Sequence, residues 1–286
     1  MASRSKARDE TPAFQARAFA TTSDPASVVA FFDLDNTLLE GSSIYYIARG
    51  LMARRVFTVT QIVEFAGRQF RWATSGQENL NDIADIFAEM LTLVAGRTVE
   101  EVVGFGEEIY AERMKERIYP QTRALAQEHL AAGHQVYLVT AAAQELAELF
   151  ARELGFTGAL GTRSEVVDGV YTGRMMGKPM HGPAKATAIR ALAKDTGFDL
   201  AGCYAYSDSA NDLPMLESVG HPNAINPDPQ LAERAQTEGW PSHDFRGKRV
   251  AARTAGAVSG AAVSVGSAVS GRLKSGLTAL RRSPSD

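Results

Sequence analysis

The chain has 286 residues, of which 45% are hydrophobic and 22% charged, and its formal net charge is −3. A chain of this length and composition can bury a large core, so it is expected to form a soluble globular protein with one large domain or a domain plus an insert. The single cysteine, Cys203, excludes a disulfide framework and favours a reducing cytoplasm. The five histidines show no ligand-like pairing, so a zinc site is not expected.

The first strong pattern is a strand that ends on acids. Residues 1–26 have no apolar stretch, so we expect a disordered segment there and no secretory signal. The β-favouring run at 28–32 then predicts a buried strand, which leads directly into Asp33 and Asp35. Open α/β sheets bind ligands at this end of their strands. Two carboxylates so close together repel each other, which indicates a cation or a shared proton, although a turn rich in Asp and Asn is the alternative.

Residues 41–118 change to a helical pattern, in which apolar side chains recur at helical spacing. The repeat is clearest at Leu80, Ile83, Ile86, Phe87, Met90 and Leu91. No strand pattern of comparable quality interrupts this block. We therefore expect a helical cap that is inserted after the first strand and lies over its end.

The rest of the chain alternates strands and helices. The predicted strands cover residues 134–140, 203–207 and 223–226, the last of them short, and the predicted helices cover 120–133, 141–154 and a segment that opens at Gly182. An Asp-Gly pair at Asp168 and Gly169 predicts a hairpin between residues 162 and 175. Alternation of this kind predicts an α/β fold with a doubly wound parallel sheet.

The last segment, residues 242–286, is rich in Ala, Gly, Ser and Val, and from Arg246 onward it carries eight basic residues and one acid. Its apolar residues follow one helical stripe. An amphipathic helix on an anionic membrane surface is therefore an alternative to a solvated tail, whereas Gly and Ser dilute the stretch too much to favour a membrane span. The expected parts are a disordered segment at 1–26, a catalytic core at 27–40 and 119–241, a cap at 41–118 and this tail.

Polar groups follow three of the predicted strands and open one of the helices. They are Asp33 with Asp35, Thr140, Lys185, and Asp208 with Asp212. The carboxyl ends of parallel strands share one edge of a sheet, so these side chains can converge. Four carboxylates without histidine or thiolate favour Mg²⁺ as cofactor, and a lysine and a hydroxyl beside the ion suit a phosphate group. One carboxylate can take a phosphoryl group and release it to water, while a second acts as acid and base.

This combination resembles the haloacid dehalogenase-like phosphohydrolase superfamily and, within it, the phosphoserine-phosphatase-like branch (subfamily IB), which has a helical cap. The similarity extends from about residue 28 to 241 and rests on Asp-Leu-Asp-Asn-Thr at 33–37, on the later motifs in the same order, and on the hairpin sequence at 168–174. The resemblance implies a phosphatase that uses Asp33 as nucleophile and Asp35 as general acid and base.

The resemblance also assigns the remaining groups. Thr140 and Lys185 would contact the phosphate, and Mg²⁺ would be held by Asp33, Asp35, Asp208 and Asp212. Lys178 is an alternative to Lys185, but Lys185 opens a helix as the family's lysine does.

Two positions depart from the family pattern. Ser207 precedes Asp208 where a glycine is usual, which leaves the acids in place. Ser42 stands where phosphoserine phosphatases carry a cap glutamate that recognises the substrate amine. The expected substrate is therefore a small phosphorylated metabolite without an amino-acid head, with Ser42 and Asn211 as candidate substrate-side residues.

Other functions remain as alternatives. A phosphotransferase would use the same site with another acceptor, and a regulatory or membrane-recruited role would depend on the basic tail. A phospho-receiver domain is disfavoured because its acidic pair and its acceptor lie on different strands and it has no cap. A nucleic-acid partner is not expected, since the acidic body would repel phosphates.

Overall fold

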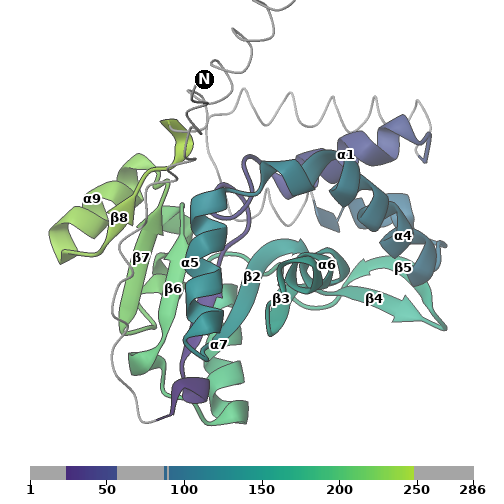
Figure 1. Cartoon of the computed structure of the whole chain (residues 1–286). Helices are drawn as coiled ribbons and strands as arrows, with labels where there is room; N and C mark the ends of the chain where they lie inside the picture. Colours follow the sequence, from purple (N-terminus) through teal and green to yellow (C-terminus); the bar gives the residue numbers. More distant parts are fainter. Residues whose placement is uncertain (1–23, 57–86, 89, 248–286) are drawn as a thin grey trace, which may run out of the picture. The chain divides into compact units, whose positions relative to one another are not determined.

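The computed structural model describes residues 24–56, 87–88 and 90–247 (Figure 1). The chain divides into two compact units, Met1–His243 and Asp244–Asp286, and all elements below belong to the first. The predictions for residues 1–23, for the apolar repeat at Leu80, Ile83 and Ile86, and for most of the tail lie outside the described residues. Within the described ranges, no helix combines the length and apolar character that crossing a bilayer requires.

Six strands form one parallel sheet (Figure 1). In spatial order they are β3 (Gly158–Thr162), β2 (Gln135–Ala143), β1 (Val29–Phe32), β6 (Tyr204–Ser207), β7 (His221–Ile225) and β8 (Ser242–His243). The chain order runs outward from β1 through β2 to β3, and outward from β6 through β7 to β8. It therefore reverses between β1 and β6, which is where open α/β sheets bind ligands. The predicted doubly wound α/β fold is confirmed.

Helices connect these strands. They are α5 (Pro120–Ala131), α6 (Gln144–Leu154), α7 (Pro183–Thr196), the one-turn α8 (Leu213–Leu216) and α9 (Pro229–Glu238). Proline occupies the first turn of four of them, where its missing N–H costs nothing. Gly155, Gly197 and Gly239 end three of them in the left-handed region, which glycine enters without strain.

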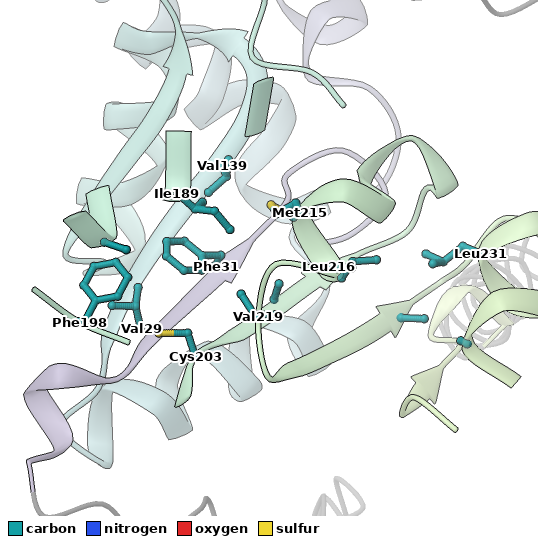
Figure 2. Packing of buried hydrophobic residues seen from close by; sticks show 14 residues of the cluster. Val29, Phe31, Val139, Ile189, Phe198, Cys203, Met215, Leu216, Val219 and Leu231 are labelled. Carbon is teal, nitrogen blue, oxygen red and sulfur yellow. The ribbon is translucent and has the colours of Figure 1, made fainter. Parts of the chain in front are cut away.

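The core lies on both faces of β1, all four residues of which are buried. On one face, Val29 and Phe31 pack with Ile189 of α7 and with Met215 of α8 (Figure 2). On the other face, Phe32 stacks on Tyr206 of β6, with the ring centroids 4.3 Å apart. Burying a side chain as large as phenylalanine is worth about 1.5–3 kcal/mol. Packing on two faces holds β1, and hence the residue that follows it, in one position.

The segment between β1 and α5 contains α1 (Ser43–Ala53) and α4 (Val99–Ile109), followed by a π-helical turn at Tyr110–Met114 and a 3-10 turn at Lys115–Arg117. The two helices approach closely, because a β-carbon on Gly50 would lie 2.4 Å from the Ile109 side chain. The chain leaves the main sheet after β1 and returns before α5 through two neighbouring segments. Tyr119 N–H donates to Leu38 O at 2.8 Å, and Glu40 N–H donates to Arg117 O at 2.8 Å. Two adjacent crossings connect this helical segment to the sheet.

A separate two-stranded sheet contains β4 (Ser164–Val167) and β5 (Val170–Met175), which are antiparallel. Asp168 and Gly169 form its turn with φ of +51° and +77°, so the predicted hairpin is confirmed. Tyr171 of β5 is buried against Phe87, Leu91 and Val94.

Two predicted details of the main sheet are wrong, and one strand was missed. The helix predicted from residue 141 begins at Gln144, because β2 continues to Ala143 by pairing with Thr162 of β3. The strand β3 itself, Gly-Ala-Leu-Gly-Thr, was not predicted, since glycine and alanine give little strand signal without a neighbouring strand. The strand at 223–226 is not the last, because β8 pairs beside β7.

Two histidines contact each other in the interior, in a hydrogen-bonded network and not as metal ligands. The His129 and His134 Nδ1 atoms lie 2.8 Å apart, and His129 Nε2 lies 2.8 Å from the Tyr206 hydroxyl. Burial lowers the pKa of His129 to about 3, and His134 adds to the effect. Because His129 is fully buried and joined to Tyr206, this network connects α5 to β6 two residues before Asp208.

We expect His129 to make the protein less stable in acid. Its pKa is lowered from 6.5 to about 3, so below pH 6.5 the unfolded state binds a proton that the folded state does not. The free energy of unfolding should fall by up to about 1.4 kcal/mol per pH unit between these values. Urea unfolding of His129→Phe should show a shallower decline with falling pH than the wild type.

Tyr206→Phe is the control for this experiment. It removes the hydroxyl partner but keeps the histidine, so it should lose stability while retaining the wild-type pH slope. Equal slopes in the wild type and His129→Phe would contradict the assignment.

Candidate functional site

Four elements bring polar side chains to the carboxyl edge of the sheet at its reversal. Asp33 follows β1 directly and Asp208 follows β6 directly, while Thr140 lies within the last residues of β2. Lys185 lies in the first turn of α7. The predicted groups therefore share one edge, as parallel strands require.

Lys185 joins two of the predicted acids. Its ammonium donates to Asp33 Oδ1 at 2.5 Å and to Asp212 Oδ2 at 2.7 Å. Burial lowers the pKa of Lys185, but Asp212 and Asp33 more than offset this and raise it overall, so the lysine remains charged. Ser207 adds a hydrogen bond from its hydroxyl to Asp212 Oδ2 at 2.7 Å. Lys178, the alternative, is exposed.

Asp35 is held by the start of α1. Ser43 donates its backbone N–H to Asp35 Oδ1 at 2.8 Å and its hydroxyl to Oδ2 at 3.2 Å. Burial raises the pKa of Asp35, and the two Ser43 hydrogen bonds oppose the rise. Ser42, the candidate predicted from the sequence, is exposed and its side chain makes no capping hydrogen bond. Sequence reasoning missed Ser43, although its position at the helix start was a usable signal.

The acids have more negative charge than Lys185 alone can balance. Burial raises the pKa of Asp33 to about 7, with Asp212 and Asp35 adding to the rise and Lys185 opposing it. Burial raises the pKa of Asp208 to about 8, again with repulsion from Asp33 and Asp212. Both shifts mean that the protein alone disfavours full ionisation of these acids. A further positive charge at the site would reverse this tendency.

Two threonines near the acids and the candidate Asn211 make weaker contacts with the site, or none that the structure describes. Thr37 donates to Asp208 Oδ1 over a long 3.5 Å. Thr140 is buried, and its hydroxyl oxygen accepts the N–H of Ala142 at 3.1 Å, which orients it along the strand. Asn211 is exposed in a 3-10 turn. Sequence reasoning missed Thr37 as a contact, although it lies in the same motif as Asp33.

Two residues beyond β7 brace the acid-bearing loops. Asp228 accepts the N–H groups of Ala210 at 2.8 Å and Leu231 at 2.7 Å, and its own N–H donates to Asp208 O at 2.7 Å. Asn226 donates its side-chain amide to Asn36 O at 2.7 Å. The Leu231 contact is the N-cap of α9, which the Asp-Pro pair at 228 and 229 signals locally. The contacts with Ala210 and Asn36 reach loops distant in the sequence, so no local pattern marks them.

The donor set fits a hard divalent cation. Asp212 Oδ1 is buried and has no hydrogen-bond partner, so it has an oxygen lone pair available. In the described part of the chain, no three Asp, Glu, His or Cys side chains already form a cluster of metal-binding size. Mg²⁺ usually keeps several water ligands and takes only one or two carboxylates, and oxygen donors are those it prefers. The carboxylates of Asp33, Asp208 and Asp212 are suitable donors.

Buried acids and a charged lysine lie where the strand order of the parallel sheet reverses, so the protein is of the α/β class and has a site that pairs anionic and cationic groups. Comparison with known proteins shows its family. The family described as haloacid dehalogenase-like hydrolase matches residues 30–217. The chain therefore belongs to the haloacid dehalogenase-like hydrolases and, within them, to the phosphoserine-phosphatase-like phosphatases, as its motifs predict.

Individual relatives support this assignment. A phosphoserine phosphatase of Mycobacterium tuberculosis is 49% identical over 227 residues, covering 79% of this chain and 74% of the relative. A histidinol-phosphatase of Neisseria meningitidis is 31% identical and covers 76% of this chain and 99% of the relative. Among solved structures, a Bordetella pertussis protein of unknown function is 31% identical with a TM-score of 0.69, covering 77% of this chain and 99% of that one.

We expect Asp228→Ala to weaken both the fold and the site. The change removes the acceptor of the part-buried Ala210 N–H and the N-cap of α9, and the loss of such a cap by itself costs about 0.5–2 kcal/mol. Because it also frees the loop that carries Asp208, the Mg²⁺ concentration for half-maximal hydrolysis of p-nitrophenyl phosphate should rise about 10- to 100-fold.

The matched control is Asp199→Ala. Asp199 accepts the N–H of Ala201 at 2.9 Å in another 3-10 turn and does not contact the site. It should lower the melting temperature without changing the Mg²⁺ requirement. A metal requirement that shifts equally in both variants would show that Asp228 acts through stability alone.

Proposed function

We propose that the chain is a Mg²⁺-dependent phosphatase that hydrolyses a small phosphomonoester through a phosphorylated Asp33. The observation that carries the proposal is the buried Lys185, which contacts Asp33 and Asp212 together. A lysine in this position opposes the rise in the pKa of Asp33, which favours the ionised form that a nucleophile needs, and it supplies positive charge for a phosphate group.

The reaction would proceed in two displacements at phosphorus. In the first, a carboxylate oxygen of Asp33 bonds to phosphorus, the bond from phosphorus to the ester oxygen breaks, and Asp35 donates a proton to the departing alkoxide. In the second, Asp35 accepts a proton from water, the water oxygen bonds to phosphorus, and the bond to Asp33 breaks. Microscopic reversibility makes one residue suited to both proton transfers.

The geometry around Asp35 supports its role as acid and base. Burial raises its pKa, which favours the protonated form needed in the first displacement. The two hydrogen bonds from Ser43 hold both carboxyl oxygens, so the group is fixed in orientation. Mg²⁺, held by Asp33, Asp208 and Asp212 with the backbone carbonyl of Asp35, would neutralise the phosphate charge. Thr140 would contact the phosphate from β2.

The substrate is a small phosphorylated metabolite, and Ser42 and Asn211 remain candidates for its recognition. The named relatives act on different compounds, phosphoserine in one case and histidinol phosphate in another. We place the reaction in the cytoplasm, which the single, buried and free thiol of Cys203 supports.

Asp33→Asn and Asp35→Asn should each lower phosphate release from p-nitrophenyl phosphate by about a thousandfold or more, because each removes a group that acts directly on the reacting atoms. Removing divalent metal with EDTA should have the same effect and be reversed by added Mg²⁺. Steady-state rates, with phosphate release as the readout, measure all three.

The loss of activity in Asp33→Asn should not be accompanied by a loss of thermal stability. The raised pKa of Asp33 shows that its charge is unfavourable in the fold, so Asp33→Asn should melt at the wild-type temperature or above it. Asp199→Asn is the control for activity and should turn over at the wild-type rate. Full activity in EDTA or in Asp33→Asn would overturn the proposal.

A further inference from the structure

An apolar cavity of about 100 Å³ lies among α1, α4 and α6. Its walls include Ile47 of α1, Val103 of α4 and Leu149 of α6, and its remaining lining is also predominantly apolar. Apolar cavities of similar size in other proteins stay dry and take up compact hydrocarbons such as benzene. A cavity of this kind therefore suits a ring or a short branched alkyl group.

Some residues of the cavity wall are close neighbours in the chain of residues in the candidate active site. Ile44 lines the cavity, and the preceding Ser43 makes both hydrogen bonds to Asp35. Ala142 also lines it, and its N–H donates to the Thr140 hydroxyl at 3.1 Å. Ser43, which contacts the predicted acid, is therefore adjacent in the chain to a wall residue. Ala142, which contacts the predicted phosphate ligand, is itself a wall residue.

The described wall has few polar groups: the carboxyl group of Glu145, the phenol of Tyr171 and the hydroxyl of Ser164, whose oxygen is buried and has no hydrogen-bond partner. Among the described residues that line the cavity, none is a lysine, arginine or histidine. The one acid, Glu145, lies in the first turn of α6 and is hydrogen-bonded to Tyr171, where burial first and then this acid raise the pKa of the phenol. A substrate carboxylate would find no positive partner among these described residues, so its desolvation would be uncompensated there.

We propose that this cavity receives the leaving group, and that the substrate is the phosphate ester of an alcohol with a compact apolar or aromatic body. The inference rests on the proposed function, since it concerns the part of the substrate that departs from phosphorus. It names a substrate class that differs from phosphoserine, whose ammonium and carboxylate groups have no matching pair here.

The test compares esters whose alcohols are similarly poor leaving groups: benzyl phosphate, phosphoserine, phosphoethanolamine and methyl phosphate, each with the full chain and Mg²⁺. Benzyl phosphate should have a kcat/KM at least about tenfold above those of phosphoserine and phosphoethanolamine, because only it places apolar surface in the cavity. A preference for either amine-bearing ester would overturn the inference.

Gly106→Leu probes the cavity directly. Gly106 lines it from α4, and a β-carbon there would meet Leu149 at 3.9 Å, an ordinary contact, so that a longer side chain extends into the space. The variant should lower kcat/KM for benzyl phosphate about tenfold or more, mainly through KM, and leave methyl phosphate within about twofold.

Gly104→Leu is the matched control on the same helix. A β-carbon at Gly104 meets nothing within 4 Å, and Gly104 does not line the cavity. Both changes replace a helical glycine with a better helix former, so neither should unfold α4. Equal losses for benzyl and methyl phosphate in Gly106→Leu, or the same benzyl loss in Gly104→Leu, would refute the cavity as the leaving-group site.

Binding gives a readout that is independent of turnover. Calorimetry of the wild type with benzylphosphonate should show a more negative heat-capacity change than with methylphosphonate, since apolar burial has that signature. Equal heat-capacity changes would count against the inference. Phosphate release from methyl phosphate without a benzyl preference would refute this inference alone, whereas no Mg²⁺-dependent release from any of the esters would refute the proposed function with it.

Discussion

The arrangement of the site depends on one buried cation, the ammonium group of Lys185. It lies between Asp33 and Asp212, and all three side chains are almost fully buried. In a low-dielectric interior an unpaired carboxylate is costly, and four of them at one sheet edge could not all remain charged without positive partners. The raised pKa values of Asp33 and Asp208 show that one lysine is not enough. The site is therefore poised for further positive charge, which is what a divalent cation supplies when bound.

The packing of the sheet explains how the fold tolerates several buried acids at one edge. β1 is buried on both faces, and Asp33 N–H donates to Tyr206 O at 2.9 Å immediately past the paired residues. The core on either side of β1 stabilises the strands whose ends carry the acids, so the cost of the acidic edge is offset elsewhere in the same domain. The reversal of strand order between β1 and β6 leaves room at that edge for a ligand.

The helical segment between β1 and α5 connects the site to the apolar cavity. Its two crossings are hydrogen-bonded to each other, so α1 starts from a fixed point and places Ser43 on Asp35. The next residue of α1 already belongs to the cavity wall. One helix therefore orients the predicted acid and forms part of the cavity wall, which links the proposed proton transfer to the proposed leaving-group cavity.

Much of the site was predictable because its signals are local in the sequence. Asp33 and Asp35 follow a β-favouring apolar run, and Lys185 stands at a helix start, so strand-end and helix-start patterns found them without any knowledge of contacts. The parallel fold followed from the alternation of elements. The predicted strand ends were less reliable, as the extension of β2 to Ala143 shows, because pairing with β3 decides it.

The sequence by itself determined the kind of chemistry, the identity of the acids and the class of fold. The tertiary structure alone decided which groups touch. Lys185 and Asp33 are 152 positions apart, and His129 and Tyr206 are 77 apart, so no local pattern could pair them. Ser43 contacts Asp35 and its neighbour Ser42 does not, because the fold buries Ser43 at the start of α1 and leaves Ser42 exposed. The cavity, too, exists only where helices distant in sequence pack together, since its shape depends on side chains that meet across them.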